Sequence, residues 1–275
     1  MTAVISLLRS APFSARLGLG MVCITLLAAV LAPVIAPYGE TEVAGEVWLS
    51  ASKDHFIGTD NLGRDLFSRL LYGARNTIAI AFVITGISFL IGVVFGFLAA
   101  TVKGWMDQFL SRCVDILMAF PTLIFALMVL SVVGTSIPAM VVVIALLDST
   151  RVFRLSRAVA MDIEVMELVE AARLRGEGLW WLMRHEILPN AMPPLVAEFG
   201  LRFCFVFLFI AALSFLGLGI QPPTADWGSM VRENAGAITF GIYTPLWPAA
   251  AIAFLTVGVN LIVDWFLHIA SGLED

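Results

Sequence analysis

Long apolar runs constrain this chain more than any other feature of its sequence. About 20 apolar residues in helical conformation cross the hydrocarbon layer of a bilayer, so a run of that length predicts a transmembrane helix. Only 13% of the residues are charged and 60% are hydrophobic, whereas about a quarter of the residues are charged in typical soluble domains. The sequence therefore predicts an all-α membrane protein with six spans, near residues 17–36, 77–100, 114–133, 137–151, 194–218 and 246–269.

The first apolar run follows Arg9 and Arg16 and extends from Leu17 to Ile35. It is longer than the core of a signal peptide, and no small-x-small cleavage site precedes the polar stretch after it. We therefore expect a retained first span and not a cleaved leader.

The basic residues predict how the spans are oriented. With a cytoplasmic N-terminus, ten of the 16 Lys and Arg residues fall in inside segments, five fall in outside segments, and Arg202 lies within the fifth span. Because basic residues concentrate on the cytoplasmic side, both termini are predicted to be cytoplasmic. We divide the chain into two parts. Residues 1–76 contain the N-terminal tail, the first span and an external segment that begins at residue 37. Residues 77–275 form a five-helix core with a cytoplasmic loop over 152–193.

The external segment is predicted to end in an interfacial helix capped by Thr59 or Asp60. Its apolar side consists of Leu62, Leu66, Phe67, Leu70 and Leu71, and its charged side of Arg64, Asp65, Arg69 and Arg75. Such a helix can lie along the membrane surface or pack on the bundle, and its sequence leaves both open.

Few residues in this sequence could form a catalytic, metal-binding or nucleotide-binding site. A phosphate-binding loop needs Gly-Lys-Ser/Thr, and neither Lys53 nor Lys103 has these neighbours, so any ATP must bind to another polypeptide. The three histidines lie far apart, and the cysteines form no C-x-x-C pair. We therefore expect no catalytic, metal or cofactor site and no nucleic-acid partner. A membrane-embedded enzyme that uses scattered residues remains the alternative from another class.

Charged residues inside spans are costly and require an explanation. Arg112 and Asp115 are three residues apart, Glu198 and Arg202 are four apart, and Asp148 and Asp264 stand singly; these residues fall in or beside apolar runs. They can mark a solute path, or they can pair to fix the register of neighbouring helices. The second interpretation is favoured, because most of them lie near a membrane boundary.

The cytoplasmic loop contains a run of good helix formers from Met166 to Arg175, and Gly176 is suited to end that helix. Helical spacing places Leu168, Ala171, Ala172 and Arg175 on one face and Glu167, Glu170 and Leu174 on another. A short amphipathic helix held below two spans can dock into a groove of a partner protein or lie on lipid headgroups. The physical pattern alone leaves both open.

Several motifs in this chain resemble those of one transporter family. Glu170-Ala171-Ala172, Gly176 and then Ile187-Leu188-Pro189-Asn190 resemble the EAA loop of binding-protein-dependent ABC importer permeases, in the dipeptide/oligopeptide/nickel branch. Other stretches resemble signatures of that branch's C-type subunit, namely residues 58–65, 115–121, 214–219 and 221–228. Glu186 departs from the pattern, which has an apolar residue there.

The resemblance implies a type I importer fold with a MetI-like core and a role as half of a path for peptides across the bacterial inner membrane; nickel, opines or another small solute are the alternatives. It also implies three kinds of partner: a second, homologous permease that forms a heterodimer, two ATPase subunits that bind ATP and Mg²⁺, and a periplasmic or lipid-anchored solute-binding protein. The residues implied to couple to the ATPase are Glu167, Glu170, Ala171, Ala172, Gly176, Leu188 and Pro189.

Overall fold

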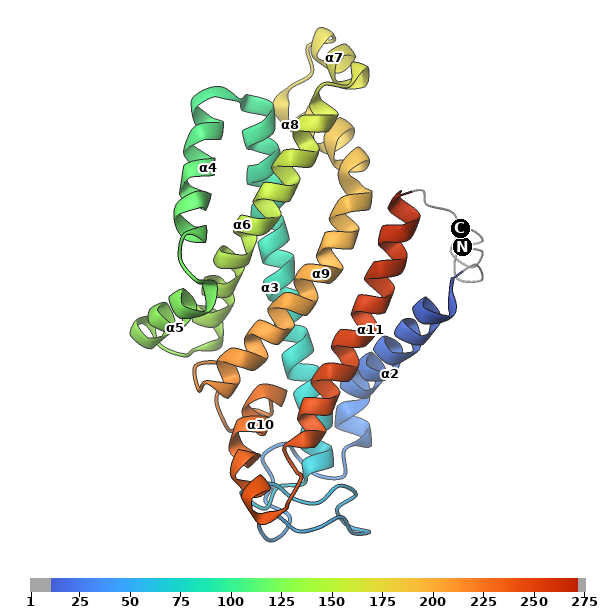
Figure 1. Ribbon diagram of the computed structural model, residues 1–275, viewed down its shortest axis with the longest axis vertical. Coiled ribbons are helices and arrows are strands. Elements are labelled where there is room, and N and C mark those ends of the chain that lie inside the picture. Colours follow the sequence, from blue (N-terminus) through green and yellow to red (C-terminus); the bar gives the residue numbers. More distant parts are fainter. Residues whose placement is uncertain (1–10, 272–275) are drawn as a thin grey trace.

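A computed structural model describes residues 11–271 as an elongated bundle of long helices (Figure 1). The helices of the first half are α2 (Phe13–Ile35), α3 (Leu66–Val102), α4 (Gly104–Met118), α5 (Thr122–Val133) and α6 (Ile137–Glu164). The second half contains α7 (Glu167–Leu174), α8 (Leu179–Leu182), the π-helical turn η1 (Met183–Ile187), α9 (Leu188–Phe215), α10 (Trp227–Asn234), the 3₁₀ helix η2 (Ala235–Phe240) and α11 (Leu246–Ser271).

Four stretches in the described part of the chain are long and apolar enough to cross a membrane: α2, α3, Leu179–Phe215 and α11. A fifth is added if α4 and α5, which are bent by 85° against each other, count as one span. The predicted fourth run, 137–151, is the first half of α6, whose second half carries Arg151, Arg154 and Arg157. The all-α membrane fold is confirmed, and length and composition support four or five spans in place of the predicted six.

The predicted interfacial helix does not exist as a separate element. Residues 36–65 form an irregular segment, and α3 then continues without a break for 37 residues from Leu66. Its N-cap is Asp65, whose carboxylate accepts a hydrogen bond from the Ser68 amide at 2.8 Å. The helix does not stop at its charged residues, because Arg69 is fully buried and paired inside the protein. The division between residues 76 and 77 therefore falls within α3.

Three buried charges and one part-buried charge fasten this irregular segment to α3 and α10. Asp60 accepts hydrogen bonds from Arg64 Nε at 2.7 Å and from Arg69 Nη1. Glu233 of α10 accepts from Arg64 Nη2 at 2.8 Å and from Arg69 Nη1 at 2.9 Å. Asn234 adds a neutral link, because its side-chain oxygen accepts from the amide of the residue after Asp60 at 3.0 Å. The charged residues expected to cap a helix or face the membrane surface thus hold this end of the molecule together.

Tight loop geometry explains the glycines of the 58–65 motif. Gly58 and Gly63 have φ angles of +88° and +75°, which disfavour any residue with a Cβ. A Cβ would also lie 2.3 Å from the Leu49 carbonyl oxygen at the first position and 2.1 Å from the Gly45 carbonyl oxygen at the second. The motif therefore describes a packed loop and not the start of a helix.

The third predicted span, 114–133, is divided by a sharp bend. Helix α4 ends at Met118, and Pro121 is the N-cap of α5. Proline disfavours helical backbone in the residue before it and lacks an amide hydrogen, which accounts for the interruption. Helix α4 also begins ten residues earlier than expected, at Gly104, and none of its residues is buried.

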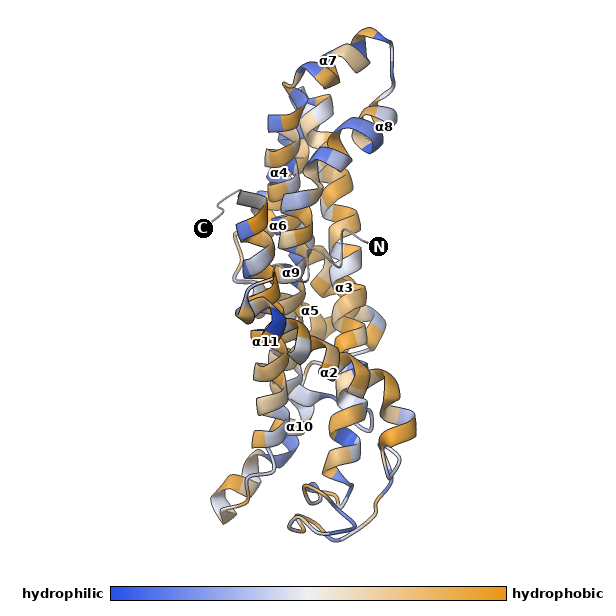
Figure 2. Cartoon of the chain, turned by 90° about the vertical axis from the view of Figure 1, so that its right-hand side faces the viewer, coloured by the Kyte–Doolittle hydropathy of each residue, from blue (hydrophilic) through white to orange (hydrophobic). Residues whose placement is uncertain are grey.

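Helices α3 and α6 pack closely at the centre of the bundle. A Cβ on Gly92 would lie 2.5 Å from the Cβ of Val152, and one on Gly96 would lie 2.8 Å from the Phe153 carbonyl oxygen. Small residues at this spacing let two helix backbones approach each other. Figure 2 shows apolar residues along the middle of the bundle and more polar residues toward its ends, including the end that carries α7.

Candidate functional site

Helix α7 projects beyond α6 and α9 at one end of the molecule (Figures 1 and 2). It ends as predicted at Gly176, whose φ is +82°. The Gly176 amide donates to the Arg173 carbonyl at 2.9 Å, and the Glu177 amide donates to the Ala172 carbonyl at 3.2 Å. These two bonds form a Schellman motif, which satisfies carbonyl groups that would otherwise end the helix unpaired.

One face of α7 is anchored in a small apolar core. Val169 and Ala172 are both fully buried, together with Ile163 of α6, Leu182 of α8 and Ile187 of η1. The predicted division into faces was therefore partly wrong, because Leu168 and Ala171 are exposed while Val169 points inward. In a helix of eight residues two apolar stripes compete, and the neighbouring helices decide which of them is buried.

A buried carboxylate fixes the approach to α7. Glu164, the last residue of α6, has a side chain that is only 2% exposed. It pairs with Lys103 Nζ at 2.7 Å, from the corner between α3 and α4, and with Arg173 of α7. The sequence analysis did not identify Glu164. Its partners Lys103 and Arg173 lie 61 residues before it and nine residues after it, so no local sequence pattern connects the three residues.

The opposite face of α7 is open. Val165 and Leu174 are 80% and 83% exposed, and Met166 and Leu168 are also exposed. The predicted residues Glu167, Glu170 and Ala171 are exposed beside them. This outer surface, made of these seven residues, combines apolar and acidic side chains, and a contiguous exposed apolar patch is characteristic of an interaction site.

The chain returns to the bundle through a π-helical turn. The Leu188 amide bonds to the Met183 carbonyl five residues back, as in a π-helix, and α9 begins at this point, just before Pro189. The Asn190 side-chain amide donates to the Glu186 carbonyl at 2.6 Å. Leu188 and Pro189 therefore lie at the re-entry point and are not part of the outer surface of α7. π-helical turns of this kind are frequent at functional sites.

Glu186, the departure from the expected pattern, has a structural partner. The guanidinium of Arg175 lies 3.8 Å from Glu186 and 3.8 Å from Glu177. It also lies 5.6 Å from the ring centroid of Trp181. An acid at position 186 thus helps to hold the segment after α7 against the segment that re-enters the bundle.

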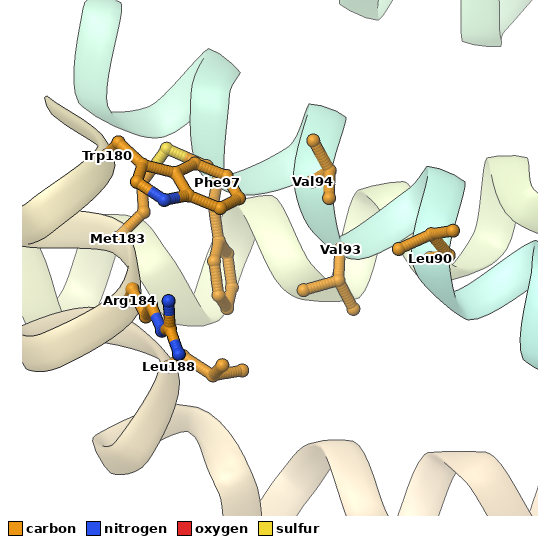
Figure 3. Close-up of a pocket in the computed structure, with 8 residues that line it drawn as sticks. All are labelled: Leu90, Val93, Val94, Phe97, Trp180, Met183, Arg184 and Leu188. Carbon is orange, nitrogen blue, oxygen red and sulfur yellow. The ribbon is translucent and has the colours of Figure 1, made fainter.

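An apolar pocket of about 290 Å³ lies behind this segment, between α3 and the α8–α9 stretch (Figure 3). Leu90, Val93, Val94 and Phe97 line one side, and Trp180, Met183, Arg184 and Leu188 line the other. Among the described residues that line the pocket, Arg184 is the one with a charged side chain, and none carries a carboxylate, hydroxyl or imidazole group. Within residues 11–271, no three His, Cys, Asp or Glu side chains are placed to hold a metal ion.

Comparisons with known proteins match this architecture to a family. Residues 92–271 match the family described as "Binding-protein-dependent transport system inner membrane component". The dipeptide transport system permease protein DppC of Alkalihalophilus pseudofirmus is 32% identical, over 89% of this chain and 82% of that protein. The di/tripeptide transport system permease protein DppC of Pseudomonas aeruginosa is 34% identical, over 90% and 84%.

Two further similarities extend this result. The glutathione transport system permease protein GsiD of Pectobacterium atrosepticum is 33% identical, over 78% of this chain and 71% of that protein. A crystal structure of an amino acid ABC transporter with histidines superposes with a TM-score of 0.54 at 20% identity, over 72% of this chain and 92% of that one. At that identity the likeness supports the fold alone.

The architecture and these matches define a membrane permease of an ABC importer. The chain belongs to the family of binding-protein-dependent transport system inner membrane components. The resemblance drawn from the sequence motifs is confirmed, and the chain is a transport subunit and not an enzyme. Membership implies ATPase and solute-binding partners.

The glycine turn that ends α7 can be tested by substitution. If Gly176 has the coupling role that the EAA-loop resemblance implies, Gly176→Ala should weaken ATPase coupling, because alanine at a positive φ costs about 1 kcal/mol and frays the end of the helix. Gly178→Ala is the matched control, since Gly178 has φ −77° and, like Gly176, open space where a Cβ would lie. The ratio of solute-stimulated to basal ATPase activity in the purified transporter measures the effect. Equal ratios in the two variants would contradict this role for the Gly176 turn.

Proposed function

We propose that this chain forms half of the translocation path of an ABC importer for peptides. Two of the reported relatives are named as permeases for dipeptides or for di- and tripeptides, and each match covers about nine tenths of this chain. A third is named for glutathione, which is itself a modified tripeptide. Nickel, opines and other small solutes are the competing possibilities.

In this proposal α7 is the helix through which an ATPase drives the permease. The supporting observation is its open outer surface, which is held on a rigid base by Val169, Ala172 and Glu164. An amphipathic helix of this kind suits a groove in a partner protein. Glu167, Glu170 and Ala171 would contact the ATPase, Ala172 and Gly176 would set the shape of the helix, and Leu188-Pro189 would connect it to the bundle. ATP and Mg²⁺ would bind to the ATPase subunits.

The remaining partners follow the same scheme. A second, homologous permease would complete the path as a heterodimer, and a periplasmic or lipid-anchored binding protein would deliver the solute from outside. The chain would reside in the inner membrane of a bacterial cell. The excess of basic residues on one side supports a cytoplasmic location for both termini and for α7.

Cysteine labelling tests this orientation. In a variant whose three native cysteines are replaced by serine, Glu177→Cys should react with a membrane-impermeant maleimide only after the cells are opened. Lys53→Cys, at an exposed position in the 36–65 segment, should react in intact cells. The reverse pattern would place α7 outside and remove the basis for its contact with an ATPase.

Reconstitution tests the solute class. The chain, its second permease and the ATPase subunits are placed in proteoliposomes with the solute-binding protein encoded beside them. We expect labelled di- or tripeptides to be taken up in an ATP-dependent manner and to raise ATPase activity, while Ni²⁺ does neither. Stimulation by Ni²⁺ alone, or transport by the solitary chain, would overturn the proposal.

A further inference from the structure

Basic residues line the second half of α6, and acids of a neighbouring helix face them. Asp107 of α4 accepts two hydrogen bonds from Arg157, from Nε at 2.5 Å and from Nη2 at 2.7 Å. Nearer the middle of the bundle, Asp115 accepts from Arg154 Nη2 at 2.7 Å. In Figure 1, α4 lies beside the half of α6 that leads to α7. The charged face of α6 thus extends from the centre of the bundle toward the α7 end.

A polar cleft accompanies this face. It lies between α4 and α6, has a volume of about 280 Å³, and is lined by Ser111, Val114, Asp115, Phe153, Arg154 and Arg157. The side chains of Arg154 and Asp115 are 56% and 46% exposed, so their pairing leaves much of their hydrogen-bonding capacity free. Ionisable side chains that line a polar cleft between the helices of a membrane protein are candidates for a solute pathway.

Farther into the bundle, a second set of charges connects α6 with α9. Asp148 is 2% exposed, and within residues 11–271 neither of its carboxylate oxygens has a hydrogen-bond partner in good geometry, although Ser88 and Arg202 lie close enough to interact with it. The nearest cation is Arg202 Nη1, at 3.6 Å. Arg202 Nε lies 2.8 Å from Glu198, but its N–H is not directed at that carboxylate. The guanidinium groups of Arg151 and Arg202 both lie on Phe205, 4.6 and 5.3 Å from its ring centroid.

These charges are poorly arranged for stability alone. Buried polar groups in native proteins are nearly always hydrogen-bonded, so Asp148 and Arg202 hold unused capacity at a cost. The set of Asp148, Arg151, Glu198 and Arg202 contains two charges of each sign. A ligand that carries both an ammonium and a carboxylate could engage both signs, whereas a bare metal cation could engage only the two acids.

Resting on the proposed function, we propose that the charged face of α6, between α4 and α9, forms the α7-side half of the solute path and takes the charged termini of zwitterionic peptides. Asp115 and Asp148 receive the ammonium end, and Arg154 and Arg202 receive the carboxylate end. The charged face thereby limits the solute to chains with free termini. The competing interpretation is that the pairs only fix the register of the helices.

The double variant Arg154→Gln with Asp115→Asn separates these interpretations. An exposed ion pair adds little to stability, so the double variant should assemble normally under either interpretation, and a pair that makes no contact with the solute should leave uptake by the assembled transporter unchanged. We expect normal assembly but about tenfold slower uptake of a tripeptide with free termini, because charge-assisted contacts to the peptide are lost. Lys53→Gln, which removes an exposed charge far from this face, is the control and should not change uptake. Normal uptake by the double variant would overturn the inference.

Cross-linking gives a second measurement that does not depend on the variant. A tripeptide with free termini and p-benzoylphenylalanine at its middle position is delivered by the solute-binding protein to the complete transporter, which is then trapped with ATP and vanadate. Illumination should attach it to the segments 107–115 or 148–157, and attachment only elsewhere would overturn the inference. Uptake by the unaltered transporter is measured first: if no peptide is taken up, the proposed function itself fails, and the result is distinct from a failure of the path.

Discussion

Leu174→Asp should remove the ATPase subunits from the purified transporter. Leu174 is 83% exposed on the outer surface of α7, so the change should alter the stability of the permease itself by less than about 0.5 kcal/mol. In a docked complex the same side chain would be buried, and an unpaired carboxylate there would cost several kcal/mol. A loss of about 3 kcal/mol weakens binding by roughly 100-fold.

Co-purification and uptake measure this prediction together. We expect the variant to insert normally, to lose its ATPase subunits during purification, and to support no ATP-dependent peptide uptake. Val43→Asp is the matched control, because Val43 is 67% exposed at the opposite end of the molecule and should leave ATPase association unchanged. Normal association of Leu174→Asp would support the alternative that α7 rests on lipid headgroups.

The sequence predicted the position and end of α7 but not its orientation. Helix formers followed by Gly176 define the element, because these are local properties of the chain. The choice of Val169 as the buried residue depends on Ile163, Leu182 and Ile187, which reach it from three other elements. The role of Glu164 depends on Lys103, from a distant corner of the fold. Long-range partners of this kind leave no periodic signal.

The difference between local and long-range information also applies to the predicted membrane spans. Apolar runs located the long helices, because hydropathy is summed along the local sequence. The ends of these helices were less predictable where a charged residue pairs with a residue that is distant in the sequence. The sequence predicted Arg69 on an interfacial helix and Arg154 in a cytoplasmic loop that begins at residue 152, yet α3 and α6 continue through these two residues. Glu233 pairs with Arg69, and Asp115 pairs with Arg154, so both arginines are accommodated within a helix.

The network around Asp60 should be the most sensitive ionic site for stability. Asp60 and Arg69 are fully buried, and Arg64 is 3% exposed. Removing one partner from a buried ion pair leaves a charge with no solvent to stabilise it, at a typical cost of about 3–5 kcal/mol. For Asp60→Asn we expect about 3 kcal/mol, at the low end, because Glu233 still contacts both guanidinium groups.

Thermal denaturation of the purified permease in detergent measures this loss. Asp54→Asn is the control, since Asp54 is an exposed carboxylate in the same irregular segment and should leave the melting temperature unchanged. The double variant Asp60→Asn with Arg64→Gln should lose less stability than the sum of the two single variants, because one change removes a positive charge that the other leaves unpaired. Additive losses, or equal melting temperatures for Asp60→Asn and Asp54→Asn, would contradict the view that the charges around Asp60 fasten the irregular segment 36–65 to α3 and α10.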